Sequence, residues 1–170
     1  MTIRQAKSDD FDTIHEFVKT AFQTAQMPYD NEEDFVLRLR ARDTYIPELE
    51  LVAEENGEII GHIMFTKLTV NTDEGEYIGL LLAPLAVKLE ERSKGIGEKL
   101  TYAGFEIGRK LGYTASFLVG YPDYYKKFGY KEIGEFGIEN KTGIENEYVL
   151  GCEIVKGSLD NIMGYIDYME

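Results

Sequence analysis

The sequence has 170 residues, which suits one domain rather than two full-sized ones. With 44% hydrophobic and 12% aromatic residues it is too apolar for a disordered chain, and no apolar run approaches a membrane span. A single cysteine, Cys152, excludes internal disulfides and multi-cysteine metal sites. The first residues lack the apolar stretch of a signal peptide, so we expect a cytoplasmic protein with no bound metal and no membrane partner.

The net charge of −13 constrains the partners of this chain. A uniformly acidic surface repels phosphate backbones, so nucleic-acid binding is not expected. A cationic partner, such as an amine, is favoured by the same charge. Solubility alone also explains an acidic surface, and that interpretation stays open.

The predicted elements alternate between strands and helices along the chain. Ser8 is expected to cap a first helix that Met27–Asp30 breaks, and Asn31 to cap a second. The apolar face of the first helix is predicted to be Phe11, Ile14, Val18, Ala21, Phe22 and Ala25. The expected strands cover 3–7, 49–54, 58–70, 77–87, 114–119, 131–133 and 147–155, and the later helices cover 97–111 and 122–128.

Three local signals shape the predicted sheet. Asn56-Gly57 is a strong two-residue hairpin signal between two strands. The strand at 77–87 is almost wholly apolar, as expected of a central strand covered on both faces, and Pro84 within it marks a bulge or a place where strands part. We therefore predict an α/β fold with a mixed sheet and helices on both faces. Gly104, Gly108 and Gly112 indicate a smooth helix face packed on that sheet.

The segment with the clearest chemical signal is Arg92-Ser93-Lys94-Gly95-Ile96-Gly97, between the central strand and a helix. Glycines let a ligand approach the backbone, and the amides at a helix start are unpaired, so this turn suits a phosphate or pyrophosphate. Arg92 and Lys94 add positive charge. Neither G-x-G-x-x-G nor a Walker loop fits, because Leu100 stands where the first needs glycine and the order Ser93-Lys94-Gly95 breaks the second.

The pattern R-x-x-G-x-G after a bulged central strand resembles the coenzyme A loop of the GNAT superfamily of N-acetyltransferases. Tyr125-Lys126-Lys127-Phe128-Gly129-Tyr130 is similar to that family's Y-x-x-x-G-[FY] segment, and the order of elements matches from about 3 to 155. The segments 79–87, 120–125 and 157–160, with Gly164, resemble the YhbS-like branch of predicted acetyltransferases. The resemblance implies a single GNAT-like domain over 1–170, with a core at about 3–155, a tail at 156–170 and a splayed central strand pair.

The same resemblance implies how acetyl-coenzyme A (acetyl-CoA) would bind. Amides from Ser93 to Gly97 would hold the pyrophosphate, and the main chains of Leu85 and Val87 would bond the pantetheine arm. A main-chain amide near Val87 would stabilise the oxyanion. The complete implied set of coenzyme-binding residues is Leu85, Ala86, Val87, Arg92, Ser93, Lys94, Gly95, Ile96 and Gly97.

Tyr125 is the expected general acid. A thiol has a pKa of about 8.5 and a phenol one of about 10, so a tyrosine can protonate the departing thiolate. Tyr124 lies about 100° away on a helix, so both cannot face one pocket, and the motif favours Tyr125. Lys126 and Lys127 are either solvated charges or close to the coenzyme's adenosine phosphates.

The general base is not assigned by the sequence. The family often places a carboxylate on the central strand, but 77–87 contains no acid. Acidic loop residues reached through water, or His62, are candidates, although a lone strand histidine is more often a hydrogen-bonded structural residue. His15 is expected to be a partly exposed surface residue, and Cys152 buried and inert.

These observations predict an enzyme that transfers the acetyl group of acetyl-CoA to a small-molecule or peptide amine by direct attack in a ternary complex. The acceptor pocket is expected between the first two helices, their connecting loop at about 27–31 and the late strands. The alternative is a non-catalytic acyl-CoA-binding or sensor module, which the missing strand carboxylate favours and the intact Tyr125 disfavours. The sequence does not decide whether the chain forms a homodimer.

Overall fold

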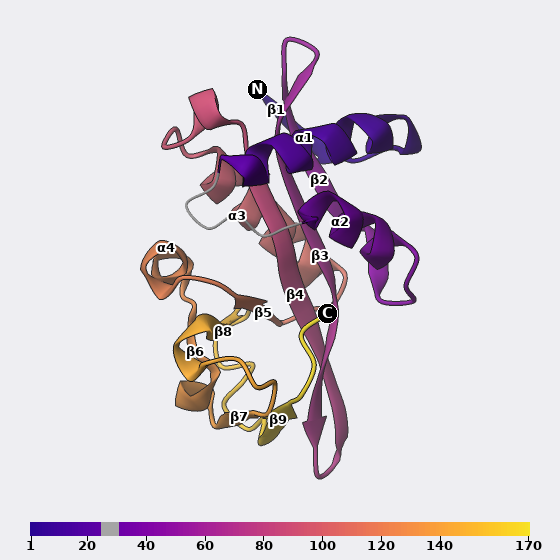
Figure 1. Cartoon of the computed structure of the whole chain (residues 1–170). Helices are drawn as coiled ribbons and strands as arrows, with labels where there is room; N and C mark the ends of the chain where they lie inside the picture. Colours follow the sequence, from indigo (N-terminus) through magenta and orange to yellow (C-terminus); the bar gives the residue numbers. More distant parts are fainter. Residues whose placement is uncertain (25–30) are drawn as a thin grey trace. The chain divides into compact units, whose positions relative to one another are not determined.

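The computed structural model describes residues 1–24 and 31–170, and these residues form two compact units. The first unit comprises Met1–Thr66 and Ala83–Ile107, and the second comprises Lys67–Leu82 and Gly108–Glu170. Two long strands, β3 and β4, pass through both units (Figure 1). The expectation of one domain over 1–170, with a separate tail, stays a prediction.

The first unit is an antiparallel sheet with helices. Its elements are β1 (Thr2–Gln5), α1 (Phe11–Gln23), α2 (Glu32–Arg40), β2 (Tyr45–Glu55), most of β3 (Glu58–Thr72), the end of β4 (Gly75–Val87) and most of α3 (Ile96–Lys110). Strand β2 pairs antiparallel with both β1 and β3. The predicted Asn56-Gly57 hairpin is confirmed, because both residues have positive φ, +52° and +79°, between β2 and β3.

The second unit completes a mixed sheet. Its further elements are β5 (Ala115–Val119), α4 (Pro122–Tyr125), β6 (Lys131–Glu132), β7 (Ile138–Asn140), β8 (Val149–Glu153) and β9 (Gly164–Ile166). Strand β5 runs parallel to β4, whereas β8 is antiparallel to both β5 and β6. The predicted α/β class with a mixed sheet is therefore confirmed.

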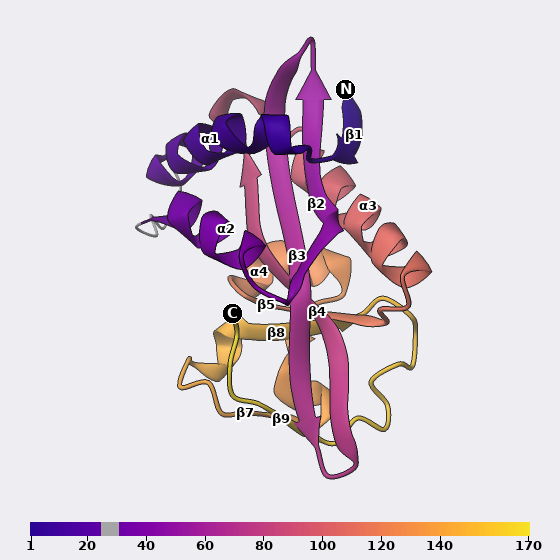
Figure 2. The ribbon, with the colours of Figure 1, turned by 90° about the vertical axis from the view of Figure 1, so that its right-hand side faces the viewer.

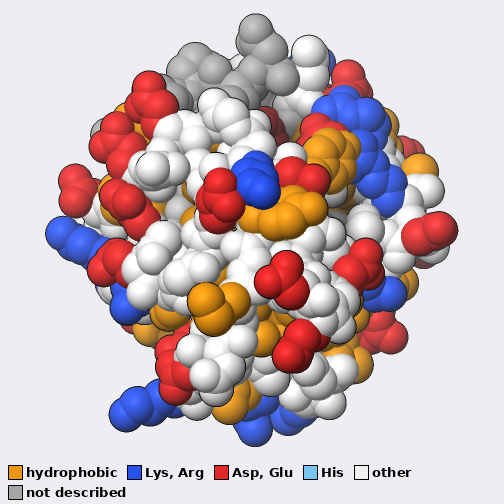
Figure 3. Space-filling model, turned by 90° about the horizontal axis from the view of Figure 1, so that it is seen from below, with side chains coloured by type: hydrophobic (Ala, Val, Ile, Leu, Met, Phe, Trp, Pro, Cys, Tyr) orange, Lys and Arg blue, Asp and Glu red, His pale blue; other side chains and the backbone are white. Residues whose placement is uncertain are grey.

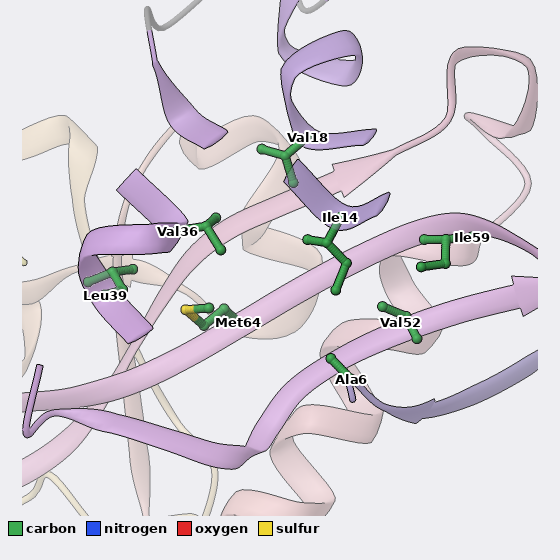
Figure 4. Close-up of a cluster of buried hydrophobic side chains, with 8 residues drawn as sticks. All are labelled: Ala6, Ile14, Val18, Val36, Leu39, Val52, Ile59 and Met64. Carbon is green, nitrogen blue, oxygen red and sulfur yellow. The ribbon is translucent and has the colours of Figure 1, made fainter. Parts of the chain in front are cut away.

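Successive side chains of β2 and β3 point to opposite faces of the first unit's sheet, and helices pack against each face. Figure 2 shows α1 and α2 on one side of these strands and α3 on the other. On the α1 and α2 side, Figure 4 shows one apolar cluster made by Ala6, Ile14, Val18, Val36, Leu39, Val52, Ile59 and Met64. Removing these side chains from water fixes the two helices on the strands. Ala25, expected on the same helix face, lies outside the described residues.

Small residues allow α3 to lie close to the opposite face of the sheet. A Cβ atom on Gly61 of β3 would come within 2.9 Å of Leu100 Cδ1, and one on Gly104 of α3 would overlap the ring of Phe65. In the second unit, a Cβ on Gly108 would approach Leu80 Cδ1 to 2.8 Å. The predicted smooth helix face is therefore confirmed for two of its glycines. Gly112 differs, because its φ of +96° ends the helix in open space.

The start of the first helix differs from the prediction. Ser8 does not cap it; residues Ser8–Asp10 form a 3₁₀ turn, and the Asp10 carboxylate accepts a 2.7 Å hydrogen bond from the Lys7 backbone N–H. Asp10 also accepts from the Arg4 guanidinium at 2.7 Å, and this bond lowers the pKa of its carboxyl to about 2. Asp10 precedes α1 without a side-chain capping bond to that helix; its ionised carboxylate closes the preceding turn by accepting from Lys7 and Arg4. Asn31 precedes α2 as predicted, but its side chain makes no capping bond.

The tail contains a strand that local sequence signals did not indicate. Strand β9 pairs with β7 in parallel, and Tyr165 on β9 pairs with Asn71 on β3 in the antiparallel direction. Gly164 is required at this position, because a Cβ atom there would overlap the Asn71 carbonyl. The tail thereby belongs to the second unit.

One face of the molecule carries acidic side chains over much of its area. Figure 3 shows one face of the molecule, on which Asp and Glu side chains are spread among uncharged ones. The acidic side chains on this face are in keeping with the net charge of −13. None of the described helices is both long and apolar enough to cross a membrane.

Candidate functional site

The loop between β4 and α3 has an open, irregular backbone. Ser93 has a φ of +62° and Gly95 one of +80°, and a Cβ atom placed on Gly95 would meet nothing within 4 Å. Helix α3 begins directly afterwards at Ile96, so the amides of its first turn have no intrahelical acceptor. The two left-handed residues turn the backbone just before a helix start, which is the arrangement that suits an anion.

Arg92 holds this loop to two other segments of the first unit. Its Nε donates to the Val87 carbonyl at 3.1 Å, while its Nη atoms donate to the carbonyls of Ala21 at 2.8 Å and Thr24 at 3.0 Å. The last carbonyls of a helix lack intrahelical donors and carry partial negative charge, so a guanidinium is well suited to them. The side chain predicted to contribute charge toward a ligand is therefore engaged with the end of α1.

Lys94 is the exposed cation of the loop. Its side chain is 58% exposed, and its Nζ lies 3.0 Å from Glu91 Oε2. An exposed ion pair of this kind contributes little to stability and exchanges partners readily. Lys94 can therefore move from Glu91 to an incoming phosphate at small cost.

The end of β4 presents the residues expected to face the coenzyme. Ala86 is buried, whereas Leu85 and Val87 are half-buried. The Lys88 N–H donates to the Ile60 carbonyl at 2.9 Å, which ties this end of the strand to β3. In the described chain, Leu85, Ala86 and Val87 thus lie in the same unit as Arg92–Gly97, joined by the bond from Arg92 to Val87.

Strand β4 pairs with β5 over a short stretch. Within the second unit, the pairs recorded for these two strands are Leu80 with Ser116 and Leu81 with Phe117. Three residues beyond Leu81, Pro84 has no N–H with which to extend a ladder. The splayed strand pair expected from the resemblance stays a prediction.

Tyr125 belongs to the second unit, at the end of the short helix α4. Its ring lies over Gly120, where a Cβ atom would approach Tyr125 Cε2 to 2.8 Å, and against the ring of Tyr130 at a centroid distance of 5.7 Å. Tyr124 meets Tyr125 edge-to-face at 4.9 Å but is 41% exposed. Packing therefore restricts the ring of Tyr125 more than that of Tyr124.

The lysines after Tyr125 lie at the surface. Lys126 is exposed with its Nζ 3.5 Å from Asp123, and the Nζ of Lys127 lies 4.5 Å from the centre of the Tyr124 ring. Both positions are compatible with solvated charges, and the alternative near adenosine phosphates stays open.

Cys152 is buried and His15 is partly exposed, as the sequence predicted. Cys152 is buried on β8, and burial raises the pKa of its thiol to about 12, so it stays protonated and unreactive at neutral pH. His15 lies on α1, partly exposed, with its Nε2 3.3 Å from Asp34 Oδ1. Neither residue is placed for nucleophilic chemistry.

A buried charged cluster was missed by the sequence reading. Glu50 on β2 and His62 on β3 are both fully buried, and His62 Nε2 lies 2.9 Å from Glu50 Oε1. The Glu50 carboxylate also accepts from Arg40 Nε at 3.0 Å and from the Tyr45 hydroxyl at 2.7 Å. The expectation that His62 is hydrogen-bonded is confirmed. A glutamate between two leucines in a strand is expected to face solvent, and no local sequence pattern indicates that Glu50 is buried.

The cluster keeps Glu50 ionised inside the protein. Burial alone would raise the pKa of Glu50, but hydrogen bonds from His62, Arg40 and Tyr45 outweigh it and hold that pKa at about 2. Burial and the neighbouring carboxylate raise the pKa of the Tyr45 phenol, so this hydroxyl remains a donor. The Arg40 guanidinium lies over the Phe11 ring at 3.8 Å, which completes its surroundings with a cation–π contact.

Comparison with known proteins identifies the family. Residues 2–133 match the family described as the acetyltransferase (GNAT) domain. The chain belongs to the GNAT family of acetyltransferases. The assignment made from the two sequence motifs is thereby confirmed.

Related GNAT proteins include two from Escherichia coli K12. The uncharacterized N-acetyltransferase YjhQ is 32% identical over 109 residues, which are 64% of this chain and 60% of YjhQ. The uncharacterized N-acetyltransferase YhbS is 24% identical over 100% of this chain and 97% of its own length. The likeness to YhbS agrees with the branch indicated by the sequence.

Two solved GNAT structures share the fold. Escherichia coli YhbS in complex with CoA has a TM-score of 0.84 at 24% identity and covers 98% of this chain and 88% of the YhbS chain. A GNAT acetyltransferase from Brucella melitensis in complex with acetyl-CoA has a TM-score of 0.77 at 28% identity, and the match covers 98% of this chain and 94% of the Brucella chain. The GNAT fold of this chain is therefore shown.

The contacts of Arg92 predict that its removal destabilises the fold more than the removal of Lys94, the other cation of the loop. Replacing Arg92 with Ala removes its bonds to the carbonyls of Val87, Ala21 and Thr24, of which Ala21 keeps a bond from the Thr24 hydroxyl, and should destabilise the fold by about 1–3 kcal/mol. Replacing the exposed Lys94 with Ala should cost less than about 1 kcal/mol. Urea denaturation measures the free energy of unfolding of both variants. An equal decrease in the two variants would contradict the role of Arg92 in joining the loop to α1.

Proposed function

We propose that this GNAT chain transfers the acetyl group of acetyl-CoA to a primary amine. The observation that carries the proposal is the open turn at Ser93–Gly95 directly before α3, in a chain of the acetyltransferase family. The acetyl-CoA bound in the Brucella melitensis structure supports the choice of co-substrate.

The residues present fit a coenzyme A pyrophosphate. Gly95 leaves free space where a side chain would stand, and the backbone of Ser93–Gly97 would donate its amides to the phosphate oxygens. Lys94 would supply a mobile counter-charge. Leu85 and Val87 would bond the pantetheine arm through their main chains. Ala86 between them and Ile96 at the start of α3 are buried, and Arg92 bonds the Val87 carbonyl at the same end of β4.

The proposed reaction is direct attack of the amine on the thioester. Acetyl-CoA supplies an acyl group that is already activated toward nucleophiles. A main-chain amide near Val87 would stabilise negative charge on the carbonyl oxygen, and Tyr125 would give a proton to the sulfur as it leaves. The ring contacts of Tyr125 with Tyr130 favour a fixed phenol for this step.

The acceptor that we propose is a small-molecule or peptide amine rather than a nucleic acid. The net charge of −13 attracts an ammonium group and repels phosphate. We place the acceptor beside α1 and α2, the helices that carry no other recognised motif. The loop expected to complete this pocket includes 27–30, which lie outside the described residues.

Coenzyme binding can be tested with two glycines of matched backbone conformation. Gly95 and Gly57 have φ of +80° and +79°, and neither has an atom within 4 Å of a built Cβ, so valine strains both alike. Gly95→Val should weaken acetyl-CoA binding at least about tenfold, equivalent to 1.4 kcal/mol, because the side chain fills the phosphate's space. Gly57→Val, in the β2–β3 hairpin, should leave affinity unchanged.

Isothermal titration calorimetry measures both affinities directly. Unchanged affinity in a folded Gly95→Val variant would overturn the proposed loop. Equal weakening in both variants would show that backbone strain, and not blocked approach, caused the effect.

Proton delivery by Tyr125 can be tested by removing one hydroxyl. General acid catalysis contributes about 10²–10⁴-fold, so Tyr125→Phe should lower kcat at least tenfold while the ring keeps its packing and the coenzyme its affinity. Tyr124→Phe is the matched control and should have little effect, because that ring is more exposed. Steady-state kinetics with an amine panel gives both values.

The outcomes of this test separate the alternatives. A large loss of kcat in Tyr124→Phe, with a normal kcat in Tyr125→Phe, would assign the general acid to Tyr124. Full activity of both would show that neither phenol is the acid. Tight acetyl-CoA binding without turnover of any amine by the unsubstituted chain would favour the sensor module.

A further inference from the structure

An exposed pair of tyrosine rings lies in the second unit. Tyr121 and Tyr148 meet edge-to-face, with ring centres 5.8 Å apart and ring planes at 88° to each other. Tyr121 is 42% exposed, and Tyr148 is half-buried. Val119 and Tyr124, close by in the chain, are exposed as well. Large apolar side chains that gather at a surface often mark a binding site, so we asked what this pair could bind.

The end of the β5–β8 ladder fixes the backbone on both sides of the pair. Val119 on β5 pairs with Val149 on β8, and the Gly120 N–H donates to the Tyr148 carbonyl at 2.9 Å. Tyr121 directly follows Gly120, and Tyr148 directly precedes Val149. Rings carried by the end of a sheet in this way stand on a rigid base, which suits a recognition site.

The surroundings of the pair are acidic. Glu145 and Glu147 are exposed in the turn before β8, where the Tyr148 N–H donates to the Glu145 carbonyl at 3.0 Å. The charge of Glu147, together with burial and the charge of Glu145, raises the pKa of the Tyr148 phenol, so this ring stays uncharged. The face of an aromatic ring is electron-rich, so rings and carboxylates together favour a cation and disfavour an anion.

A neighbouring tyrosine of the same short helix already binds an ammonium group. The Nζ of Lys127 lies 4.5 Å from the centre of the Tyr124 ring. Within residues 1–24 and 31–170, by contrast, no lysine or arginine lies over the ring of Tyr121 or Tyr148. The pair is therefore open to a cation that comes from outside the chain.

The pair is also adjacent to the proposed general acid. The Tyr125 N–H donates to the Tyr121 carbonyl at 3.3 Å, so one helical turn separates these two residues. Tyr121, Tyr125 and Tyr148 all belong to the second unit. Strand β8, which follows Tyr148, is one of the late strands expected to line the acceptor pocket. This position favours the acceptor as the source of the cation.

We propose that Tyr121 and Tyr148, with Glu147, bind a second, non-reacting cationic group of the acceptor. The inference rests on the proposed acetyl transfer and narrows its acceptor to an aliphatic diamine. A site of negative potential favours the protonated form of an amine, whereas the nitrogen that attacks the thioester must be neutral. The bound nitrogen and the reacting nitrogen are therefore different groups of one molecule.

The charge of the second group can be changed while its shape is kept. The probes are (4-aminobutyl)trimethylammonium and its tert-butyl analogue, which share the primary amine and differ by a carbon in place of the quaternary nitrogen. For the unsubstituted chain, kcat/KM should be about tenfold higher for the cationic probe, the size expected of a partly desolvated cation–π contact. Equal kcat/KM values for the two probes would overturn the proposal.

Substitution of the rings separates this site from the general acidity of the chain. Tyr121→Leu and Tyr148→Leu should each lower the preference for the cationic probe at least about threefold, whereas Tyr121→Phe keeps a ring and should keep the preference. Tyr102→Leu is the matched control, because Tyr102 is 48% exposed and meets Phe105 edge-to-face at 83°, and it should leave the preference unchanged. Leucine variants of the pair that behave like Tyr102→Leu would overturn the proposal.

The carboxylate can be tested in the same way. Glu147→Gln should lower the preference about twofold or more, as expected for the loss of an exposed charge partner. Glu135→Gln, at another exposed position of the second unit, changes the net charge equally and should have no such effect. Equal effects of the two substitutions would remove Glu147 from the site.

A binding measurement distinguishes failure of this inference from failure of the proposed function. In the chain saturated with CoA, which has no acetyl group to transfer, the cationic probe should shift the NMR signals of the Tyr121 and Tyr148 rings, and the tert-butyl analogue should not. Shifted signals without acetylation of any amine would overturn the proposed transfer and leave the cation site standing. Acetylation of amines without any shift of these signals would overturn the cation site and leave the transfer standing.

Discussion

The hydrogen bonds of the Arg92 guanidinium join the parts of the first unit on which the proposed chemistry depends. One planar group reaches the carbonyl of Val87 at the end of β4 and the carbonyls of Ala21 and Thr24 at the end of α1. The loop that follows can then hold two left-handed residues, Ser93 and Gly95, in a fixed place before α3. The side chain that is expected to bind the ligand thus also holds together the segments that are proposed to bind it.

Burial of charge imposes a second constraint on the same unit. Glu50 lies on the sheet face covered by α1 and α2, where an unpaired carboxylate would be very costly. Three donors, from Arg40, Tyr45 and His62, remove that cost and leave the histidine in a defined tautomer. The same contacts that keep the carboxylate ionised also hold the His62 ring in one orientation inside the first unit.

The parts of the fold that could be predicted from sequence depend on neighbouring residues. The Asn56-Gly57 hairpin and the loop before α3 are encoded by local glycine and asparagine, and the Gly104 face by helical spacing. The motif around Tyr125 likewise placed that residue on a short helix ended by Gly129.

What could not be predicted depends on distant partners. Strand β9 has three residues and exists because it pairs with β7 and β3. The partners of Arg92 on α1 are about 70 residues earlier in the chain, and no local pattern indicates them. Glu50 follows the alternation of an exposed strand position, and only the fold brings Arg40 and His62 to it.

The most direct test of the central claim is hydrogen–deuterium exchange with and without acetyl-CoA. The amides of 93–98 should become protected when acetyl-CoA is bound, because they would donate to its phosphates, while the Asn56-Gly57 hairpin turn should exchange at an unchanged rate. Saturating acetyl-CoA that leaves 93–98 unprotected, or that protects only other segments, would contradict the account.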